Sequence, residues 1–221
     1  SSMTKRAVKT NVHLGSPYSS RGKDQQGDPV RFVGSVGCRA MHGTEHGFVT
    51  AAHCLPKMGL SVCIGETDTN LGKVTSVKLN ASSDAAFVAV DYDKYYPTNT
   101  TYRTKTALYD KILKNSSLVG YEVSTEGQKT ANVVKAKVTE INKKVHIEKW
   151  TPAGQADFYA NNMVYATFTS SQTQEGDSGG IVYVNGYVAG IHSARLGNTT
   201  QIFSSAELVL KDLGLTNIWE K

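Results

Sequence analysis

The chain has 221 residues, of which 39% are hydrophobic and 19% charged, and its formal net charge is +5. This composition predicts one or two compact domains and gives no reason to expect disorder. No run approaches 18 consecutive apolar residues and Ser1–Arg6 include no apolar stretch, so we expect neither a transmembrane helix nor a signal peptide here. The basic residues are scattered along the chain, which argues against nucleic-acid binding.

Short runs rich in Val, Ile, Tyr and Thr follow one another, separated by Gly or Asn. They are residues 30–40, 46–51, 60–65, 71–79, 85–91, 117–124, 132–140, 163–168 and 181–191. This spacing predicts an all-β protein. Residues 92–111 lack sustained alternation, which indicates a connection between two β halves.

Two local signals near the end of the chain are more specific. Asn185-Gly186 lies between two β-rich arms and predicts a type I′ hairpin, because both turn positions take a positive φ. Ser204-Ser205-Ala206-Glu207 offers a capping box for a helix that stops at Gly214. We expect this helix to close the fold.

Two stretches far apart in the sequence supply the parts of a nucleophilic site. "TQEGDSGGIV" (173–182) contains Ser178, and "FVTAAHC" (48–54) contains His53. A serine hydroxyl becomes a useful nucleophile when an imidazole takes its proton and a carboxylate orients that imidazole. Asp84, directly before the apolar run "AAFVAV", is the candidate acid, and Asp91 at the end of that run is the alternative.

The reaction mechanism gives a separate reason for a glycine at position 176. The backbone amides of Gly176 and Ser178 can converge on the oxyanion of a tetrahedral intermediate only if no side chain blocks the approach. We therefore expect these two residues to form an oxyanion hole.

"TAAHC" and "GDSGG", in the order His, Asp, Ser, resemble the chymotrypsin-like serine proteases. "HLGSPYSS", "SSDAAFV" and "FSSAELVLKDLG" are more similar to the bacterial streptogrisin and α-lytic protease branch than to trypsin. The resemblance implies two six-stranded antiparallel Greek-key barrels with a C-terminal α-helix. It also implies an N-terminal barrel at 13–105 that carries the histidine and aspartate, and a C-terminal barrel at 106–221 that carries the serine, the oxyanion hole and the specificity pocket.

The same resemblance implies a serine endopeptidase that works through an acyl-enzyme. We expect a polypeptide substrate, no cofactor, no metal, no nucleic-acid or membrane partner, a monomer and secretion from the cell.

The sequence departs from the family pattern at three points. The Ile-Val-Gly-Gly-type start is missing, so Asp177 must be held from within the chain, as in the bacterial relatives. Gln174 replaces the cysteine that precedes the family's Gly-Asp-Ser-Gly. Cys38 and Cys54 have the spacing of the family's histidine-loop disulfide, but matching "FVGSVGCRA" to the bacterial branch puts Cys38 several residues later than expected. If the two do pair, Cys63 stays free or competes for Cys54.

The pocket residues point to an acidic substrate. Gln172 stands where trypsin relatives carry an aspartate, so cleavage after Lys or Arg is not expected. In "GIHSAR" (190–195), His192 is similar to the pocket histidine of glutamyl endopeptidases, with Thr173 and Ser193 as neutral helpers and Arg195 as a nearby charge. We predict cleavage after Glu, and less well after Asp, provided that Arg195 neutralises Glu175.

Two other functions are compatible with the sequence. The odd number of cysteines fits a viral polyprotein-processing protease of the same chemistry, acting in the cytoplasm of an infected cell. The positive charge fits a catalytically silent binding homologue, although such proteins normally lose the serine or the histidine. Sequons at Asn80, Asn99, Asn115 and Asn198 agree with secretion.

Overall fold

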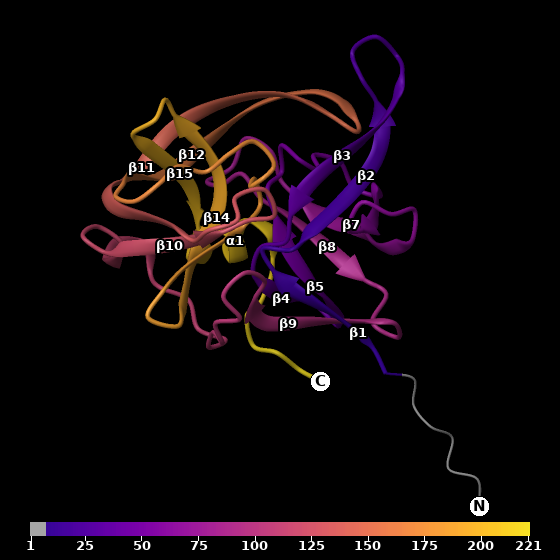
Figure 1. Cartoon of the computed structure of the whole chain (residues 1–221), viewed down its shortest axis with the longest axis horizontal. Coiled ribbons are helices and arrows are strands. Elements are labelled where there is room, and N and C mark those ends of the chain that lie inside the picture. The colour runs from indigo at the N-terminus through magenta and orange to yellow at the C-terminus, as the bar shows by residue number, and fades with distance from the viewer. Residues whose placement is uncertain (1–7) are drawn as a thin grey trace, which may run out of the picture.

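Two β-sheet systems, one from each half of the chain, lie side by side (Figure 1). The structure is a computed structural model and describes residues 8–221. Residues 1–7, where the sequence predicts no signal peptide, lie outside the described residues. Within residues 8–221, no helix has the length and apolar character needed to cross a membrane.

The first sheet has seven antiparallel strands. In spatial order they are β3 (Pro29–Ser35), β2 (Pro17–Lys23), β6 (Ser61–Ile64), β7 (Asn70–Val77), β8 (Ala86–Val90), β5 (Glu45–Thr50) and β4 (Arg39–His42). The run predicted at 30–40 divides into β3 and β4, because the amides of Val36 and Gly37 bond to carbonyls of Ser16 and Val49.

The second half of the chain closes into a six-stranded antiparallel barrel. Its strands, in spatial order, are β10 (Glu122–Glu126), β11 (Val134–Thr151), β12 (Gly154–Phe168), β15 (Thr200–Ser205), β14 (Tyr187–Leu196) and β13 (Ile181–Val184). The predicted turn between β13 and β14 is confirmed, with φ of 53° at Asn185 and 80° at Gly186. β11 and β12 run much further than the strands predicted at 132–140 and 163–168.

The connection predicted at 92–111 contains a strand that the sequence analysis missed. β9 (Tyr95–Thr101) pairs in parallel with β1 (Thr10–Leu14) in a separate two-stranded sheet. Pro97 interrupts the pattern, because proline has no amide to donate to a ladder. The chain then passes through the 3₁₀ turn η1 (Asn115–Ser117) into the barrel. The predicted domain boundary between residues 105 and 106 falls in this connection and stays a prediction.

The helix predicted at the C-terminus is present as α1 (Ala206–Leu213) and ends at Gly214 in the left-handed conformation, with φ of 66°. The predicted capping box is wrong. Ser205 makes no side-chain cap, and Glu207 accepts a hydrogen bond of 3.0 Å from a backbone amide of η1. The hydroxyl of Ser204 is used elsewhere, since it accepts from the backbone amide of Asp84 at 2.9 Å.

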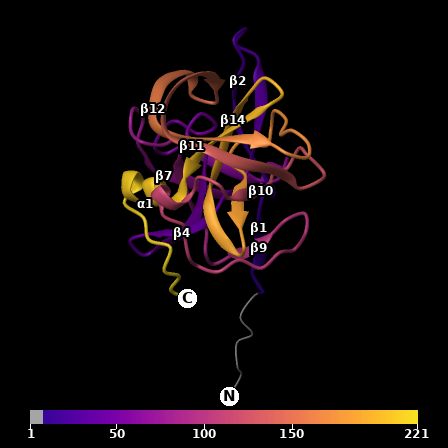
Figure 2. The same ribbon diagram turned by 90° about the vertical axis from the view of Figure 1, so that its left-hand side faces the viewer.

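Two hydrophobic cores hold these elements together. The larger core fills the first sheet around Phe48 and Phe87 and includes Val209 of α1. The second core lies inside the barrel around Phe203. Figure 2 shows α1 at the side of the molecule, where it packs against β14 and β15. The hydroxyl of Ser76 in β7 donates a hydrogen bond of 2.8 Å to the carbonyl of Leu213, the last residue of the helix. α1 therefore joins the two sheet systems.

The predicted fold class is confirmed: two antiparallel β systems are followed by one C-terminal α-helix among the described residues. One detail is corrected. The first system has seven strands instead of the six that the resemblance implies: the run at 30–40 divides into β3 and β4, and β2 lies outside the predicted runs.

Candidate active site

The histidine and the aspartate selected from the sequence are hydrogen-bonded to each other. His53 lies in the turn after β5, and Asp84 lies before β8, the strand that pairs with β5. His53 Nδ1 is 2.6 Å from Asp84 Oδ2, and the amide of His53 donates to Oδ1 at 2.9 Å. Both side chains are buried, and Ser193 Oγ donates to Asp84 Oδ2 at 2.6 Å. Asp91, the alternative acid, lies beyond the other end of β8 and faces Lys94.

Burial and charge act in opposite directions on this pair. Burial disfavours the imidazolium, but the charge of Asp84, the neighbouring Cys54 and the hydrogen bond to Asp84 raise the pKa of His53 well above its usual value. Burial favours the protonated acid, but the charge and hydrogen bonds of His53, with the hydroxyl of Ser193, lower the pKa of Asp84. Asp84 is therefore a carboxylate at neutral pH. It holds a proton on His53 Nδ1 and leaves Nε2 free for a second partner.

Ser178 lies in the loop between β12 and β13 and lines the same cavities as His53. Its Oγ donates to the carbonyl of Ser193 at 3.2 Å. Within residues 8–221 no hydrogen bond joins Ser178 Oγ to His53. Catalytic hydrogen bonds are commonly long or misaligned before substrate binds. A rotation about the Ser178 Cα–Cβ bond moves the hydroxyl away from that carbonyl.

The two amides expected to form the oxyanion hole have no acceptor. Neither the amide of Gly176 nor that of Ser178 donates a hydrogen bond within the part of the chain that the structure describes. Gly176 has φ of 104°, which a side chain would strain, and its carbonyl accepts from Ser35 Oγ at 2.9 Å and Gln128 Nε2 at 3.1 Å. The loop thus presents two free donors beside Ser178, as a developing oxyanion requires.

The structure identifies what holds Asp177. Its Oδ1 accepts from the amides of Lys129 and Thr130, both at 2.9 Å, and its Oδ2 accepts from the amide of Gln174 at 2.8 Å and from the hydroxyl of Thr130. A Cβ on Gly127 would lie 2.5 Å from Asp177 Oδ1. The loop at 127–130 therefore packs directly against this buried carboxylate and fixes the residue before Ser178.

A cavity of about 460 Å³ lies beside Ser178. All four residues predicted to bind substrate line it: Thr173, His192, Ser193 and Arg195. The first three are buried, whereas the side chain of Arg195 is exposed.

His192 is neutral in this cavity, because burial lowers its pKa to about 4. Gln201 Nε2 lies 3.1 Å from His192 Nδ1 and 2.7 Å from Thr125 Oγ1. Because Gln201 Nε2 donates to Nδ1, that ring nitrogen is the acceptor and the proton of the neutral imidazole lies on Nε2. Gln201 is fully buried and was missed in the sequence. Alternation along β15 could have found it, since Gln201 and the core residue Phe203 are two positions apart.

The expected pairing of Arg195 with Glu175 is wrong. Lys149 of β11 donates to Glu175 Oε1 at 2.9 Å, and this hydrogen bond and the charge of Lys149 lower the pKa of Glu175. Arg195 Nη1 donates to Gln172 Oε1 at 2.6 Å and has no carboxylate within ion-pair distance among the described residues. The error arose because the sequence did not predict that β11 reaches the cleft.

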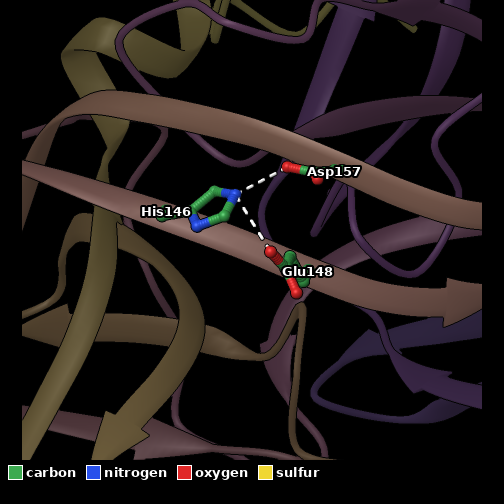
Figure 3. Close-up of side chains that lie close together, drawn as sticks. All are labelled: His146, Glu148 and Asp157. Carbon is green, nitrogen blue, oxygen red and sulfur yellow. Dashed lines mark hydrogen bonds and ion pairs between the residues drawn. The ribbon is translucent and has the colours of Figure 1, made fainter.

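A second group of ionisable side chains lies on the β11–β12 hairpin near the same cavity (Figure 3). His146 Nε2 is 2.6 Å from Asp157 Oδ1 and 3.5 Å from Glu148 Oε1. One ligand atom from each lies within 4.8 Å of the others, so this exposed group is the place where the described residues could hold a metal ion. In the structure its members pair across the two strands of the hairpin.

The expected disulfide between Cys38 and Cys54 is absent, and all three cysteines are free. Cys38 lines a small cavity with Arg39, whereas Cys54 lines the cleft beside Ser178 and Cys63 lines a third cavity. Family spacing along the chain therefore does not bring the two thiols to the same place. Burial raises the pKa of Cys38 to about 12, which makes this thiol unreactive at neutral pH.

The two-sheet fold is that of the chymotrypsin-like serine proteases. A family model described as Trypsin matches residues 15–205, and the chain belongs to the trypsin family.

Solved structures of bacterial proteases share this fold. Protease A of Thermobifida fusca has a TM-score of 0.68 and 18% identity, covering 94% of this chain and 98% of its own. A glutamic acid specific serine protease, described as using a novel histidine triad in substrate binding, has a TM-score of 0.69 and 22% identity over 93% and 99%. Alpha-lytic protease homolog N4 has a TM-score of 0.68 and 17% identity over 95% and 100%. No curated protein matches the sequence.

Proposed function

We propose that this protein is a serine endopeptidase that cleaves polypeptides through His53, Asp84 and Ser178. His53 Nε2 takes the proton of Ser178 Oγ as that oxygen attacks the peptide carbonyl, and the amides of Gly176 and Ser178 bind the oxyanion. His53 then gives its proton to the leaving amine, which leaves an acyl-enzyme. Water attacks the acyl-enzyme with His53 again acting as base. Asp84 stays ionised throughout and stabilises the imidazolium.

One observation carries this proposal: a buried and hydrogen-bonded His53–Asp84 pair lies beside a serine whose neighbouring amides have no acceptor. Taken alone, the His53–Asp84 pair, the neighbouring serine and the unpaired amides are each compatible with a purely structural role. Their meeting in one cleft of a trypsin-family fold favours catalysis over a silent binding homologue.

The test of the chemistry is labelling by a fluorophosphonate combined with hydrolysis of denatured protein. We expect the wild type to be labelled and active. Ser178→Ala should be unlabelled and should keep only the roughly 10³–10⁴-fold acceleration over water that oxyanion donors and binding supply. Its thermal unfolding should stay close to that of the wild type, because the residue is a small one at the cleft. Near wild-type turnover by Ser178→Ala would contradict the assignment.

We further propose a preference for Glu before the scissile bond. Two features of the 460 Å³ cavity support it: a neutral His192 with a proton on Nε2, and Arg195, whose charge no carboxylate balances among the described residues. Glu175 does not oppose it, because Lys149 neutralises that carboxylate. The glutamic acid specific neighbour shares the fold.

The variant His192→Val tests the preference. A hydrogen bond to a charged group contributes about 1.5–3 kcal/mol, so kcat/KM for Glu peptides should fall about 10- to 150-fold while Phe and Leu peptides change little. His42→Val is the matched control, since His42 lies in β4 outside the cavity and pairs with Glu45. A wild-type preference for Phe, Leu or Ala in a peptide library would refute the glutamyl specificity and leave the endopeptidase proposal standing.

Extracellular action belongs to this proposal, supported by the sequons and by the bacterial protease neighbours. The three free thiols favour the alternative of a polyprotein-processing protease in a reducing compartment. Mass analysis of native protein separates the two: glycans support secretion, whereas an unmodified chain with three reduced thiols supports the intracellular alternative.

A further inference from the structure

The β11–β12 hairpin leaves the barrel and crosses the cleft. Only residues 134–137 of β11 pair with β10, and only residues 164–167 of β12 pair with β15. The rest forms a two-stranded ribbon whose pairing runs up to Thr151 and Gly154. In Figure 1 this ribbon arches over the molecule and its tip ends beside β2 and β3 of the other sheet.

The tip is fastened to the first sheet. Trp150 Nε1 donates to the carbonyl of Lys23 at 2.7 Å, and a Cβ on Gly22 would lie 2.6 Å from Pro152 Cα. Further back along the ribbon, Phe158 is buried against Ala52, the residue before the catalytic histidine. The hairpin is therefore a packed bridge between the two halves.

The hairpin covers a second cavity, of about 230 Å³, next to the catalytic residues. His53 and Ser178 line this cavity as well as the 460 Å³ cavity, so the two lie on either side of the site of attack. The ion pair of Lys149 and Glu175 also borders both. A polypeptide whose Glu enters the 460 Å³ cavity and whose carbonyl meets Ser178 must place its next residue toward the second one.

Apolar side chains form a large part of the walls of the second cavity, together with polar ones such as Ser20 and Thr151. Phe32 comes from β3, Leu55 follows the catalytic histidine, and Trp150 and Pro152 come from the hairpin. Its two cations each have an acidic partner, since Lys149 pairs with Glu175 and Arg31 pairs with Asp68, although Arg31 Nε makes no hydrogen bond among the described residues. A volume of about 230 Å³ corresponds to roughly seven or eight water molecules, which leaves room for one large side chain.

We propose that the hairpin tip and β3 form a binding site for the residue that follows the scissile bond, and that this site selects a large apolar side chain. The inference rests on the proposed endopeptidase activity, because it places the leaving-group half of the substrate. The loss of a single methylene from a side chain bound in such a pocket changes kcat/KM about 10- to 200-fold.

The experiment uses the whole protein and internally quenched peptides with Glu before the bond and Leu, Phe, Ala or Asp after it. We expect kcat/KM to be at least about ten-fold higher for Leu and Phe than for Ala, and lowest for Asp. Equal rates for all four peptides would overturn the inference. Failure to cleave any peptide, with no fluorophosphonate labelling, would instead count against the proposed function.

Variants of the hairpin then assign the effect to its tip. Trp150→Ala should bring the Leu-to-Ala ratio close to one, whereas Trp150→Phe should largely keep it because an aromatic wall remains. Tyr159→Ala is the matched control, since Tyr159 is an exposed aromatic residue of the same hairpin that does not line the cavity. An unchanged ratio in a labelled, folded Trp150→Ala would overturn the role of the hairpin, and if this variant does not fold, the wild-type ratio and Trp150→Phe still decide.

Discussion

At the scale of single residues, the site depends on how Asp84 sets the charge and tautomer of His53. The carboxylate is fully buried and receives three hydrogen bonds, two from His53 and one from Ser193. Its charge is a main reason that the pKa of His53 is raised. The acid limb of the pH–activity profile reports this pKa, because only neutral His53 can accept the proton of Ser178.

Replacing Asp84 by Asn should therefore change both the height and the position of that profile. Asn presents the wrong tautomer to Ser178, and kcat should fall by about 10⁴ at neutral pH. Without the carboxylate charge the pKa of His53 drops, so the acid limb should move to lower pH. The measurement is kcat/KM between pH 4 and 9, with Asp91→Asn as control. Loss of activity in the control and not in Asp84→Asn would make Asp91 the acid.

The sequence was sufficient to select these residues, but not their supporting contacts. His53, Asp84 and Ser178 could be chosen because their chemistry and order are specific. Alternation could have placed Gln201 on the inner face of its strand, but its contact with His192 is recognised only when the partners of the buried amide are known. Lys149 is separated by 26 residues from Glu175 and reaches it only through the arch of the hairpin.

At the scale of elements, the loop at 127–130 supports the segment that we propose as the oxyanion hole. Two of its amides and the hydroxyl of Thr130 bind the buried carboxylate of Asp177, which is flanked by the two donor residues Gly176 and Ser178. Arg103 Nε donates to the carbonyl of Gly127 at 3.3 Å and so ties this loop to the start of the connection after β9. The segment around Ser178 is thus supported by the loop at 127–130 and, through Arg103, by the connection after β9.

Thr130→Val should weaken this support, and Thr130→Ser should not. Valine has a similar shape but removes one of four hydrogen bonds to a buried charge, which costs about 1.5–3 kcal/mol. We expect a lower free energy of unfolding and a lower kcat for Thr130→Val, measured by urea denaturation and peptide hydrolysis. Wild-type stability and turnover in that variant would show that the hydroxyl is dispensable.

The elements themselves were predicted unevenly. Runs in the first sheet alternate or are buried on both faces, and β5, β6, β7 and β8 lie close to the predicted ranges. The full length of the hairpin was missed because the alternation breaks between residues 138 and 145, where charged residues such as Lys143 and Lys144 lie and the register shifts three times. The pairing of β1 with β9 brings together residues about 85 positions apart, as in Thr10 and Tyr95, and no local pattern encodes it.

At the scale of the whole molecule, the structure separates the four sequons into two kinds. Asn80 and Asn198 are exposed. Asn99 Nδ2 donates to the carbonyl of Leu108 and to Asp110 Oδ1, both at 3.0 Å. The amide nitrogen of Asn115 likewise donates within the fold, to Asn142 Oδ1 at 3.0 Å. A glycan replaces one of the two amide hydrogens. Asn99 already donates to two acceptors and Asn115 is buried, so a glycan is compatible with the first two sites alone.

Expression through a glycosylating secretory pathway tests this arrangement. Active, monodisperse protein should carry glycans at Asn80, Asn198 or both, and none at Asn99 or Asn115. Glycopeptide mass spectrometry of the active fraction gives the result. A folded, active fraction modified at Asn99 would mean that the connection after β9 differs from the structure.

The way Asp177 is held shows where the order of the neighbouring Ser178 segment comes from. Every hydrogen bond that its side chain accepts comes from residues 129, 130 and 174, all within the folded barrel half. Among the described residues no chain end takes part, so the order of the segment around Ser178 is supplied inside the barrel half. We therefore expect an extension at either end of the chain to leave this segment in place.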